Sequence, residues 1–168
     1  MRKVIFLDRD GVINKERGEY AFKITDFEIN EGVFDFLKIA QNKGYEFVVI
    51  TNQGGISKKI YNHKDVNIVH EFMLTKFKQV GIDILSIYYC PHHSENENCI
   101  CRKPKSQLLE KSIARFSIDK SLSFFIGDSE RDVEAAKNVG MKGIKIESNS
   151  NLMQLKNNLI WVQKDILI

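Results

Sequence analysis

The chain has 168 residues, of which 43% are hydrophobic and 28% are charged, and its formal net charge is +3. This composition fits one compact soluble domain over residues 1–168. Basic residues are spread along the chain rather than gathered in a tail, which argues against a nucleic-acid partner. The first apolar run, Val4–Leu7, is too short for a signal-peptide core or a membrane span, so we expect a cytoplasmic protein without a membrane partner.

Short runs rich in β-branched and aromatic residues alternate with segments of helical period. The expected strands are Lys3–Leu7, Glu46–Thr51, Ile84–Tyr89, Ser123–Ile126 and Gly143–Ile146, with Leu159–Val162 as a candidate edge strand. The expected helices are Gly32–Lys43, His63–Val80, a segment from the Ser106 cap to Phe116, and one from Asp128 or Ser129 to Val139. This alternation indicates βαβ units, and hence an α/β fold with a doubly wound parallel sheet.

Polar motifs follow four of the expected strands. They are Asp8-Arg9-Asp10-Gly11, Thr51-Asn52-Gln53-Gly54, a cysteine loop that ends in Arg102-Lys103-Pro104, and Gly127-Asp128-Ser129-Glu130-Arg131-Asp132. Taken singly, the first motif fits a turn and the second fits a helix cap. In a parallel α/β sheet, however, the carboxyl ends of the strands face one crevice. Together the motifs supply the carboxylates, hydroxyl, amides and cations of a phosphoryl-transfer site.

The two aspartates of the first motif suit a reaction in which a carboxylate attacks phosphorus. Asp8 is the candidate nucleophile, because an aspartyl-phosphate divides a difficult hydrolysis into two displacements. Asp10 is the candidate general acid for the leaving alkoxide and then the general base for water. Thr51 and Asn52 can donate hydrogen bonds to phosphoryl oxygens, and Lys103 can supply a positive charge.

The attacking carboxylate and the substrate phosphate repel one another, so the site requires a counterion. Mg²⁺ prefers oxygen ligands, and Asp8 and Asp128 are well placed to bind it. Two roles are open for Asp132. It could contact a metal-bound water, or it could simply lie in the first turn of a helix.

All the cysteines lie in one loop that also contains two histidines. Its candidate metal ligands are Cys90, His92, Cys99 and Cys101. Three thiolates and one imidazole form a closed tetrahedral set for a structural Zn²⁺. The alternatives are His93 in place of His92, or cysteines without a metal. A metal there would fix the positions of Arg102 and Lys103, which follow the last ligand directly. His63 and His70, on a helix expected to lie away from the strand ends, are interpreted as surface or packing residues.

The four motifs, in this order, resemble those of the haloacid dehalogenase superfamily of aspartate-nucleophile phosphatases, and the resemblance covers nearly the whole chain. Within that superfamily, Phe6–Asn14, Thr51–Ile56 and the Cys90-Pro91-His92 loop are similar to D-glycero-D-manno-heptose-1,7-bisphosphate 7-phosphatases. The histidinol-phosphate phosphatases are close relatives of these enzymes.

The resemblance implies a Rossmann-like fold and a set of roles for individual residues. The implied nucleophile is Asp8 and the acid/base is Asp10, with phosphate contacts from Thr51 and Lys103. Mg²⁺ is implied at Asp8, the carbonyl of Asp10 and Asp128, and Zn²⁺ at the cysteine loop.

The segment between Asp10 and the first long helix is too short for a separate cap domain, so loops beside the crevice must select the substrate. The candidate substrate-binding residues are Gly18, Tyr20, Asn52, Gln53, Gly54, Arg102 and Lys103. Two departures from the family pattern bear on substrate choice. Glu19 separates Gly18 from Tyr20, and Ser129 stands where the heptose phosphatases often have Lys.

We therefore expect a monomeric phosphatase that removes the 7-phosphate of D-glycero-D-manno-heptose 1,7-bisphosphate, in nucleotide-activated heptose biosynthesis for lipopolysaccharide or surface polysaccharide. The nearest alternative is a histidinol-phosphate phosphatase with the same machinery. A polynucleotide 3'-phosphatase is less favoured, because the chain has no stripe of basic and aromatic residues to follow a strand. A zinc-stabilised binding module would leave the carboxylates as turn residues, which does not account for all four motifs.

Overall fold

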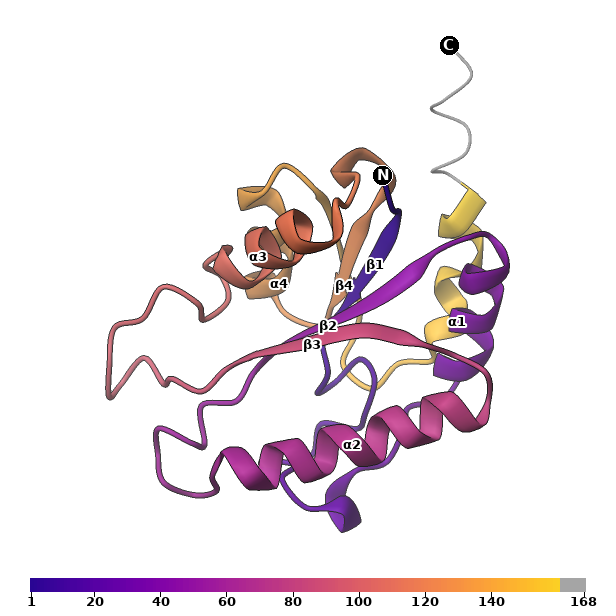
Figure 1. Ribbon diagram of the computed structural model, residues 1–168. Coiled ribbons are helices and arrows are strands. Elements are labelled where there is room, and N and C mark those ends of the chain that lie inside the picture. The colour runs from indigo at the N-terminus through magenta and orange to yellow at the C-terminus, as the bar shows by residue number, and fades with distance from the viewer. Residues whose placement is uncertain (161–168) are drawn as a thin grey trace.

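The computed structural model describes residues 1–160 and contains a five-stranded parallel sheet with helices on both faces (Figure 1). The strands are β1 (Val4–Leu7), β2 (Glu46–Asn52), β3 (Ile84–Cys90), β4 (Phe124–Gly127) and β5 (Lys142–Lys145). They lie in the order β3-β2-β1-β4-β5. The winding of the chain therefore reverses at the central strand β1, which confirms the predicted doubly wound α/β fold.

Helices α1, α2 and the 3-10 helix η3 cover one face of the sheet, and α3 and α4 cover the other (Figure 1). The helices are α1 (Val33–Asn42), α2 (His63–Gln79), α3 (Gln107–Phe116), α4 (Glu130–Asn138), η1 (Ile24–Asp26), η2 (Lys120–Leu122) and η3 (Leu152–Ile160). The strands and long helices agree with their predicted bounds to within a residue or two. The candidate strand Leu159–Val162 begins inside η3 instead, and its last two residues lie outside the described part of the chain.

Side chains of the inner strands alternate between two apolar cores. Ile5, Leu7, Phe47 and Val49 pack with α1 and α2, whereas Val4, Phe6, Val48 and Ile50 pack with α3 and α4. Because both faces are covered, the runs Val4–Leu7 and Phe47–Ile50 are apolar at every position rather than at every second one. The polar residues that follow them are thus the first ones free to line a site.

Side-chain caps fix the starts of α2 and α4. Asn62 starts α2 by accepting hydrogen bonds from the backbone N–H groups of Lys64 and Asp65. Ser129 starts α4 in a capping box with Asp132, directly after β4 ends. The first turn of α4 therefore lies at the carboxyl end of the sheet.

The segment between β1 and α1 forms loops and the short helix η1, and the segment between β3 and α3 is the cysteine loop. Within residues 1–160, neither connection forms a separate cap domain over the strand ends. In the same residues, none of the helices combines the length and the apolar character that crossing a membrane requires.

Candidate active site

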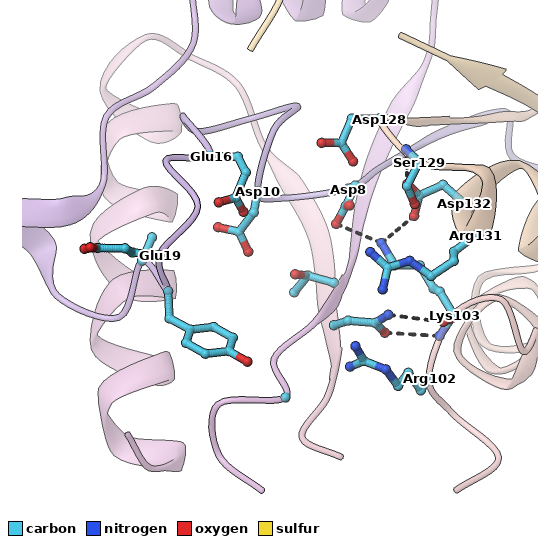
Figure 2. A pocket seen from close by; sticks show the side chains of 15 residues that line it. Asp8, Asp10, Glu16, Glu19, Arg102, Lys103, Asp128, Ser129, Arg131 and Asp132 are labelled. Atoms are coloured by element: carbon cyan, nitrogen blue, oxygen red, sulfur yellow. Dashed lines mark hydrogen bonds and ion pairs between the residues drawn. The ribbon is translucent and has the colours of Figure 1, made fainter. Parts of the chain in front are cut away.

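A cavity of about 340 Å³ opens at the carboxyl ends of β1, β2 and β4 (Figure 2). The cavity is lined by all four predicted catalytic residues and by the predicted metal ligand at the end of β4, namely Asp8, Asp10, Thr51, Lys103 and Asp128. Of the predicted substrate-binding residues, Tyr20, Asn52, Gly54 and Arg102 also line it. The structure therefore brings together residues that lie more than a hundred positions apart in the sequence.

Lys103 lies between two carboxylates at the centre of the cavity. It is 3% exposed, and its Nζ lies 2.8 Å from Oδ1 of Asp8 and 2.7 Å from Oδ1 of Asp132. The same ammonium donates to the carbonyl of Ile50 at 2.9 Å. The Asn52 amide accepts from the Lys103 backbone N–H at 3.1 Å and donates to its carbonyl at 3.2 Å. Lys103 is therefore oriented toward Asp8 by its main chain as well as its side chain.

Three carboxylates form a cluster with an oxygen-only donor set. Oxygens of Asp8, Asp128 and Asp132 lie within 4.8 Å of one another. Gly11 permits this approach, because it has a φ of +83° and a Cβ there would lie 2.0 Å from Oδ2 of Asp128. Oxygen ligands in this number fit Mg²⁺. Asp132 also accepts a hydrogen bond from the Ser129 backbone N–H at 3.0 Å, so it lies in the helical first turn and beside the cluster at once.

The negative charge in this cluster exceeds what Lys103 balances. Burial raises the pKa of Asp8 to about 7, Lys103 opposes the rise, and the charges of Asp132 and Asp10 add to it. A divalent cation is a suitable complement to such a cluster, because it would stabilise Asp8 as a carboxylate.

Asp10 is held by donors on both of its oxygens. Oδ1 accepts from Nε and Nη2 of Arg9 at 3.2 and 2.9 Å and from Nδ2 of Asn14 at 3.0 Å. Oδ2 accepts from Nε2 of Gln53 at 3.0 Å. Burial would raise the pKa of Asp10, but the charge and hydrogen bonds of Arg9, with those from Asn14 and Gln53, lower it. The carboxylate form, which can accept a proton from water, is the favoured one.

Arg9 is 1% exposed and connects Asp10 to helix α2. Its Nη1 lies 3.3 Å from Nε2 of His70, and its Nη2 donates to the carbonyl of Ala21 at 2.8 Å. Burial, together with the Arg9 charge, lowers the pKa of His70 to about 3. The prediction that His70 lies away from the strand ends is therefore wrong, because its neutral ring accepts from a residue of the first motif. His63 is exposed, and its Nδ1 lies 2.9 Å from the Tyr89 hydroxyl.

We expect His70→Gln to make the fold less sensitive to acid. The pKa of His70 falls from an ordinary value of 6.5 to about 3 on folding, so the unfolded chain binds the proton first. Stability is therefore lost as the pH drops from about 6.5 towards 3, by up to about 1.4 kcal/mol per pH unit. Glutamine can still accept from Arg9 but does not titrate. The loss of unfolding free energy between pH 7 and pH 5, measured by urea titration, should shrink by about 2 kcal/mol.

The control for this prediction is His63→Gln, which changes an exposed histidine on the same helix. That variant should keep the full loss of stability between pH 7 and pH 5. An equally large loss in His70→Gln would show that His70 is not the group that titrates.

Gln53 and Gly18 lie differently from the other predicted substrate-binding residues. Gln53 is 2% exposed, and its amide contacts Asp10, the Thr51 hydroxyl at 3.0 Å and the Tyr61 hydroxyl at 2.8 Å. Its polar atoms are thus used within the protein, behind the wall of the cavity. Gly18 lines an adjoining cavity on the outer side of the loop between β1 and η1.

Two acidic residues of that loop, Glu16 and Glu19, line the same cavity as Asp10. The Glu16 carboxylate lies beside Asp10, whereas that of Glu19 points away from it (Figure 2). Burial raises the pKa of Glu16, and the charges of Asp10 and Asp128 add to the rise. Arg102 and Arg131 lie on the opposite side with Lys103 (Figure 2). Apart from the carboxylate cluster around Lys103, the cavity therefore has an acidic side at Glu16 and Glu19 and a basic side at Arg102 and Arg131. A phosphorylated ligand would be oriented by that difference.

The predicted zinc ligands also meet in space. The cluster consists of Cys90, His92, Cys99 and Cys101, and its ligand atoms lie within 4.8 Å of one another. Nδ1 of His92 lies 3.5 Å from the Cys90 sulfur and 3.3 Å from the Cys101 sulfur. Nε2 of the same ring lies 3.9 Å from a Glu97 oxygen, which is the kind of outer contact that orients a ligating imidazole. Three sulfurs and one nitrogen fit Zn²⁺.

His93 points elsewhere, to the rim of the active-site cavity. A Cβ on Gly54 would lie 2.9 Å from Cδ2 of His93 and 3.1 Å from Nη1 of Arg102. Arg102 donates to the carbonyl of His92 at 3.0 Å. The cysteine loop therefore forms part of the cavity rim as well as the metal cluster.

We expect Cys99→Ser to lower the zinc content and reduce phosphatase activity without removing it. The metal would order a loop that has little apolar core of its own, and that loop positions Arg102. Zinc per chain, measured by elemental analysis, should fall well below one, and kcat/KM should fall about tenfold or more. Ser94→Ala changes an exposed residue of the same loop and serves as the control. Full zinc content in Cys99→Ser would remove Cys99 from the ligand set.

Comparison with known proteins agrees with this geometry. A family model described as polynucleotide kinase 3 phosphatase matches residues 3–156. A D-glycero-beta-D-manno-heptose-1,7-bisphosphate 7-phosphatase of Helicobacter pylori is 40% identical over 164 residues, which are 96% of this chain and 91% of the relative. The chain belongs to the heptose-1,7-bisphosphate 7-phosphatase family. Like its relatives in this family, it is a phosphoric monoester hydrolase with the haloacid dehalogenase fold.

Other members of the family differ in the anomer that their names specify. A D-glycero-alpha-D-manno-heptose-1,7-bisphosphate 7-phosphatase of Photorhabdus laumondii is 39% identical over 176 residues, covering 96% of this chain and 95% of the relative. A D,D-heptose 1,7-bisphosphate phosphatase of B. bronchiseptica, solved with magnesium and phosphate, has a TM-score of 0.82 and 26% identity, covering 92% of this chain and 86% of that one. Both support the assignment to the heptose phosphatase family.

A histidine biosynthesis bifunctional protein of Buchnera aphidicola is also similar, with 36% identity over 162 residues. The match covers 95% of this chain but only 45% of that relative. The chain is therefore similar to slightly less than half of a protein named for histidine biosynthesis.

Sequence reasoning missed several residues of the site. Arg9, His70 and Tyr61 act behind the cavity, and Glu16 and Arg131 line it. Arg9 had a usable signal, because an arginine between two aspartates directly after a buried strand needs a carboxylate partner. The other four lie in loops or helices whose path the sequence pattern does not specify.

Proposed function

We propose that this protein is a Mg²⁺-dependent phosphatase that removes the 7-phosphate of D-glycero-D-manno-heptose 1,7-bisphosphate. The observation that carries the proposal is the cavity in which Lys103 contacts Asp8 beside the other carboxylates, in a chain 40% identical to a phosphatase named for this substrate. We place the reaction in nucleotide-activated heptose biosynthesis for lipopolysaccharide or surface polysaccharide.

In the first displacement, Asp8 acts as the nucleophile. The Arg9 backbone N–H donates to Oδ1 of Asp8 at 2.7 Å and Lys103 contacts the same oxygen, so Oδ2 is the oxygen left for attack. A bond forms from Asp8 to the phosphorus of the 7-phosphate, and the bond from phosphorus to the sugar oxygen breaks. Asp10, which must first take up a proton from solvent because its carboxylate form is the favoured one, gives that proton to the sugar oxygen. The products are heptose 1-phosphate and an aspartyl-phosphate.

In the second displacement, water releases the phosphate. Asp10, now a carboxylate, takes a proton from water, the water oxygen bonds to phosphorus, and the bond to Asp8 breaks. Mg²⁺, when bound by Asp8, Asp128 and the carbonyl of Asp10, supplies positive charge to the carboxylates and the phosphoryl group. Asp132 lies beside that site and keeps Lys103 in place.

The remaining groups bind the two ends of the substrate. The hydroxyl of Thr51 and the ammonium of Lys103 are placed to contact the oxygens of the reacting phosphate. Arg102 and Arg131 lie on the basic side of the same cavity, and in the part of the chain that the structure describes no carboxylate pairs with Arg131. We assign these two arginines to the second phosphate, because guanidinium groups bind phosphate through two parallel hydrogen bonds.

The second candidate is hydrolysis of histidinol phosphate, which the relative from Buchnera favours. That substrate has one phosphate and a basic imidazole, so it would place no anion on Arg102 and Arg131. The acidic side of the cavity, with Glu16 and Glu19, would suit its cationic end. The two substrates are therefore expected to use opposite sides of one cavity.

The test is phosphate release with Mg²⁺, compared as kcat/KM for both anomers of the heptose bisphosphate, histidinol phosphate and a 3'-phosphorylated oligonucleotide. We expect one heptose anomer to be preferred by at least about tenfold. Arg102→Ala should then raise KM for the bisphosphate more than KM for a heptose monophosphate. A preference for histidinol phosphate would show that the proposed substrate is wrong. A preference for the oligonucleotide would show that the proposed class of substrate, a small phosphorylated sugar, is wrong.

A further inference from the structure

A chain of buried hydrogen bonds connects the general acid to an aromatic cluster in the substrate loop. Tyr61 donates from its hydroxyl to Oε1 of Gln53 at 2.8 Å. Gln53 then donates from Nε2 to Oδ2 of Asp10 and to Oγ1 of Thr51, each at 3.0 Å. Both N–H groups and the carbonyl of one amide are thus committed, and each contact favours the same orientation of that amide.

The orientation of this amide has a consequence for two residues of the proposed reaction. Thr51 accepts from Gln53, so its own hydroxyl hydrogen is left to donate toward a phosphoryl oxygen. Oδ1 of Asp10 is occupied by Arg9 and Asn14, whereas among residues 1–160 Oδ2 accepts from Gln53 alone. The oxygen that Gln53 contacts is therefore the one that can exchange a proton with the substrate.

Tyr61 is fixed by residues of the loop that borders the cavity. Its ring is stacked on Phe22, with centroids 5.1 Å apart and an interplanar angle of 13°, and meets the edge of Tyr20 at 5.5 Å. Gly55 leaves room for the ring, because a Cβ there would lie 2.1 Å from Tyr61 Cε1. The carbonyl of Ala21, between the two aromatic residues, accepts from Arg9. The same three-residue segment is therefore connected to Asp10 from two sides.

We propose that Gln53 and Tyr61 are positioning residues that orient the Asp10 carboxyl group for proton donation to the leaving oxygen and couple it to the Tyr20–Phe22 segment. This inference rests on the proposed phosphatase mechanism and extends it to specificity. A substrate seated against Tyr20 also contacts the segment that sets the orientation of the acid. Gln53 and Tyr61 are themselves neutral and buried, so they act on Asp10 through geometry.

The test uses the dependence of the rate on the leaving group. An alkoxide leaving from a sugar phosphate needs the proton from Asp10, whereas p-nitrophenolate needs it much less. Tyr61→Phe keeps the aromatic stack and removes only the hydroxyl. We expect the ratio of kcat for the sugar phosphate to kcat for p-nitrophenyl phosphate to fall about tenfold, with KM changed less than about twofold.

A second variant and a matched control complete the design. Gln53→Met cannot donate to Asp10, so the same ratio should fall at least as far, and the double variant should fall no further than Gln53→Met alone, because the residues act in series. Tyr45→Phe removes a hydroxyl from another buried tyrosine, at the start of β2, and should leave the ratio unchanged.

Two results would overturn the inference. One is an unchanged ratio in Tyr61→Phe, whether both esters are slowed equally or neither is slowed. The other is a double variant whose effects multiply, which would mean that Tyr61 and Gln53 act independently. If the wild-type enzyme prefers another alkyl phosphate, the proposed substrate is wrong and the same ratio is measured with that ester.

Discussion

Asp8→Asn is expected to reduce turnover of every phosphate ester by at least about a thousandfold, because an amide oxygen does not displace an alkoxide from phosphorus. Loss of activity should not come from loss of folding. Asp8 is raised in pKa by burial, with the charges of Asp132 and Asp10 contributing, so replacing its carboxylate removes repulsion as well as the ion pair with Lys103. Phosphate release and urea unfolding, measured on the same preparation, check the two parts.

The control is Asp35→Asn, which changes an exposed aspartate in the first turn of α1 that does not line the active-site cavity. It should retain wild-type turnover. Substantial activity in Asp8→Asn would assign the nucleophile to another group. A large loss of stability in that variant would contradict the expected intact fold and would explain the inactivity by unfolding.

Lys103→Met is expected to lower both stability and activity. It removes the ammonium that lies 2.8 Å from Asp8 and 2.7 Å from Asp132, which leaves one buried and one partly buried carboxylate without their cation. Breaking a buried ion pair on one side costs about 3–5 kcal/mol. Activity should fall by about two to three orders of magnitude, because the reacting phosphate loses its nearest positive charge.

Magnesium separates the two effects in this variant. With the carboxylates unpaired, Mg²⁺ should raise the unfolding free energy of Lys103→Met more than that of the wild type. Lys38→Met, an exposed substitution on α1, should respond to Mg²⁺ by the same amount as the wild type. Urea titrations with and without Mg²⁺ measure this difference. An identical response in all three proteins would contradict a cation site at Asp8 and Asp128.

Much of the fold and part of the site were predictable because their causes are local. Five apolar runs alternating with amphipathic segments specify a parallel sheet, and the residues after each run must then meet at one edge. The cysteine loop was predictable for a similar reason, since three thiols and an imidazole at close spacing have few other uses.

What could not be predicted depends on how separate elements pack. The contact of Arg9 with His70 requires the position of α2 under the first motif, and the stack of Tyr61 on Phe22 requires the path of two loops. Gln53 illustrates the limit, because its place after β2 was predictable but the direction of its side chain was not. The predicted edge strand from Leu159 is wrong for another reason, since a short apolar run fits a strand or a helical turn equally well.

The close approach of the thiols in the cysteine cluster has a consequence for handling the protein. The sulfurs of Cys90 and Cys101 lie 3.1 Å apart, and that of Cys99 lies 3.7 Å from Cys90. A disulfide between Cys90 and Cys101 would need the sulfurs to approach by about one ångström more. Protein whose metal has been removed with a chelator should therefore form this disulfide in air and then fail to bind the metal again. Protein kept with a thiol reductant should bind the metal again.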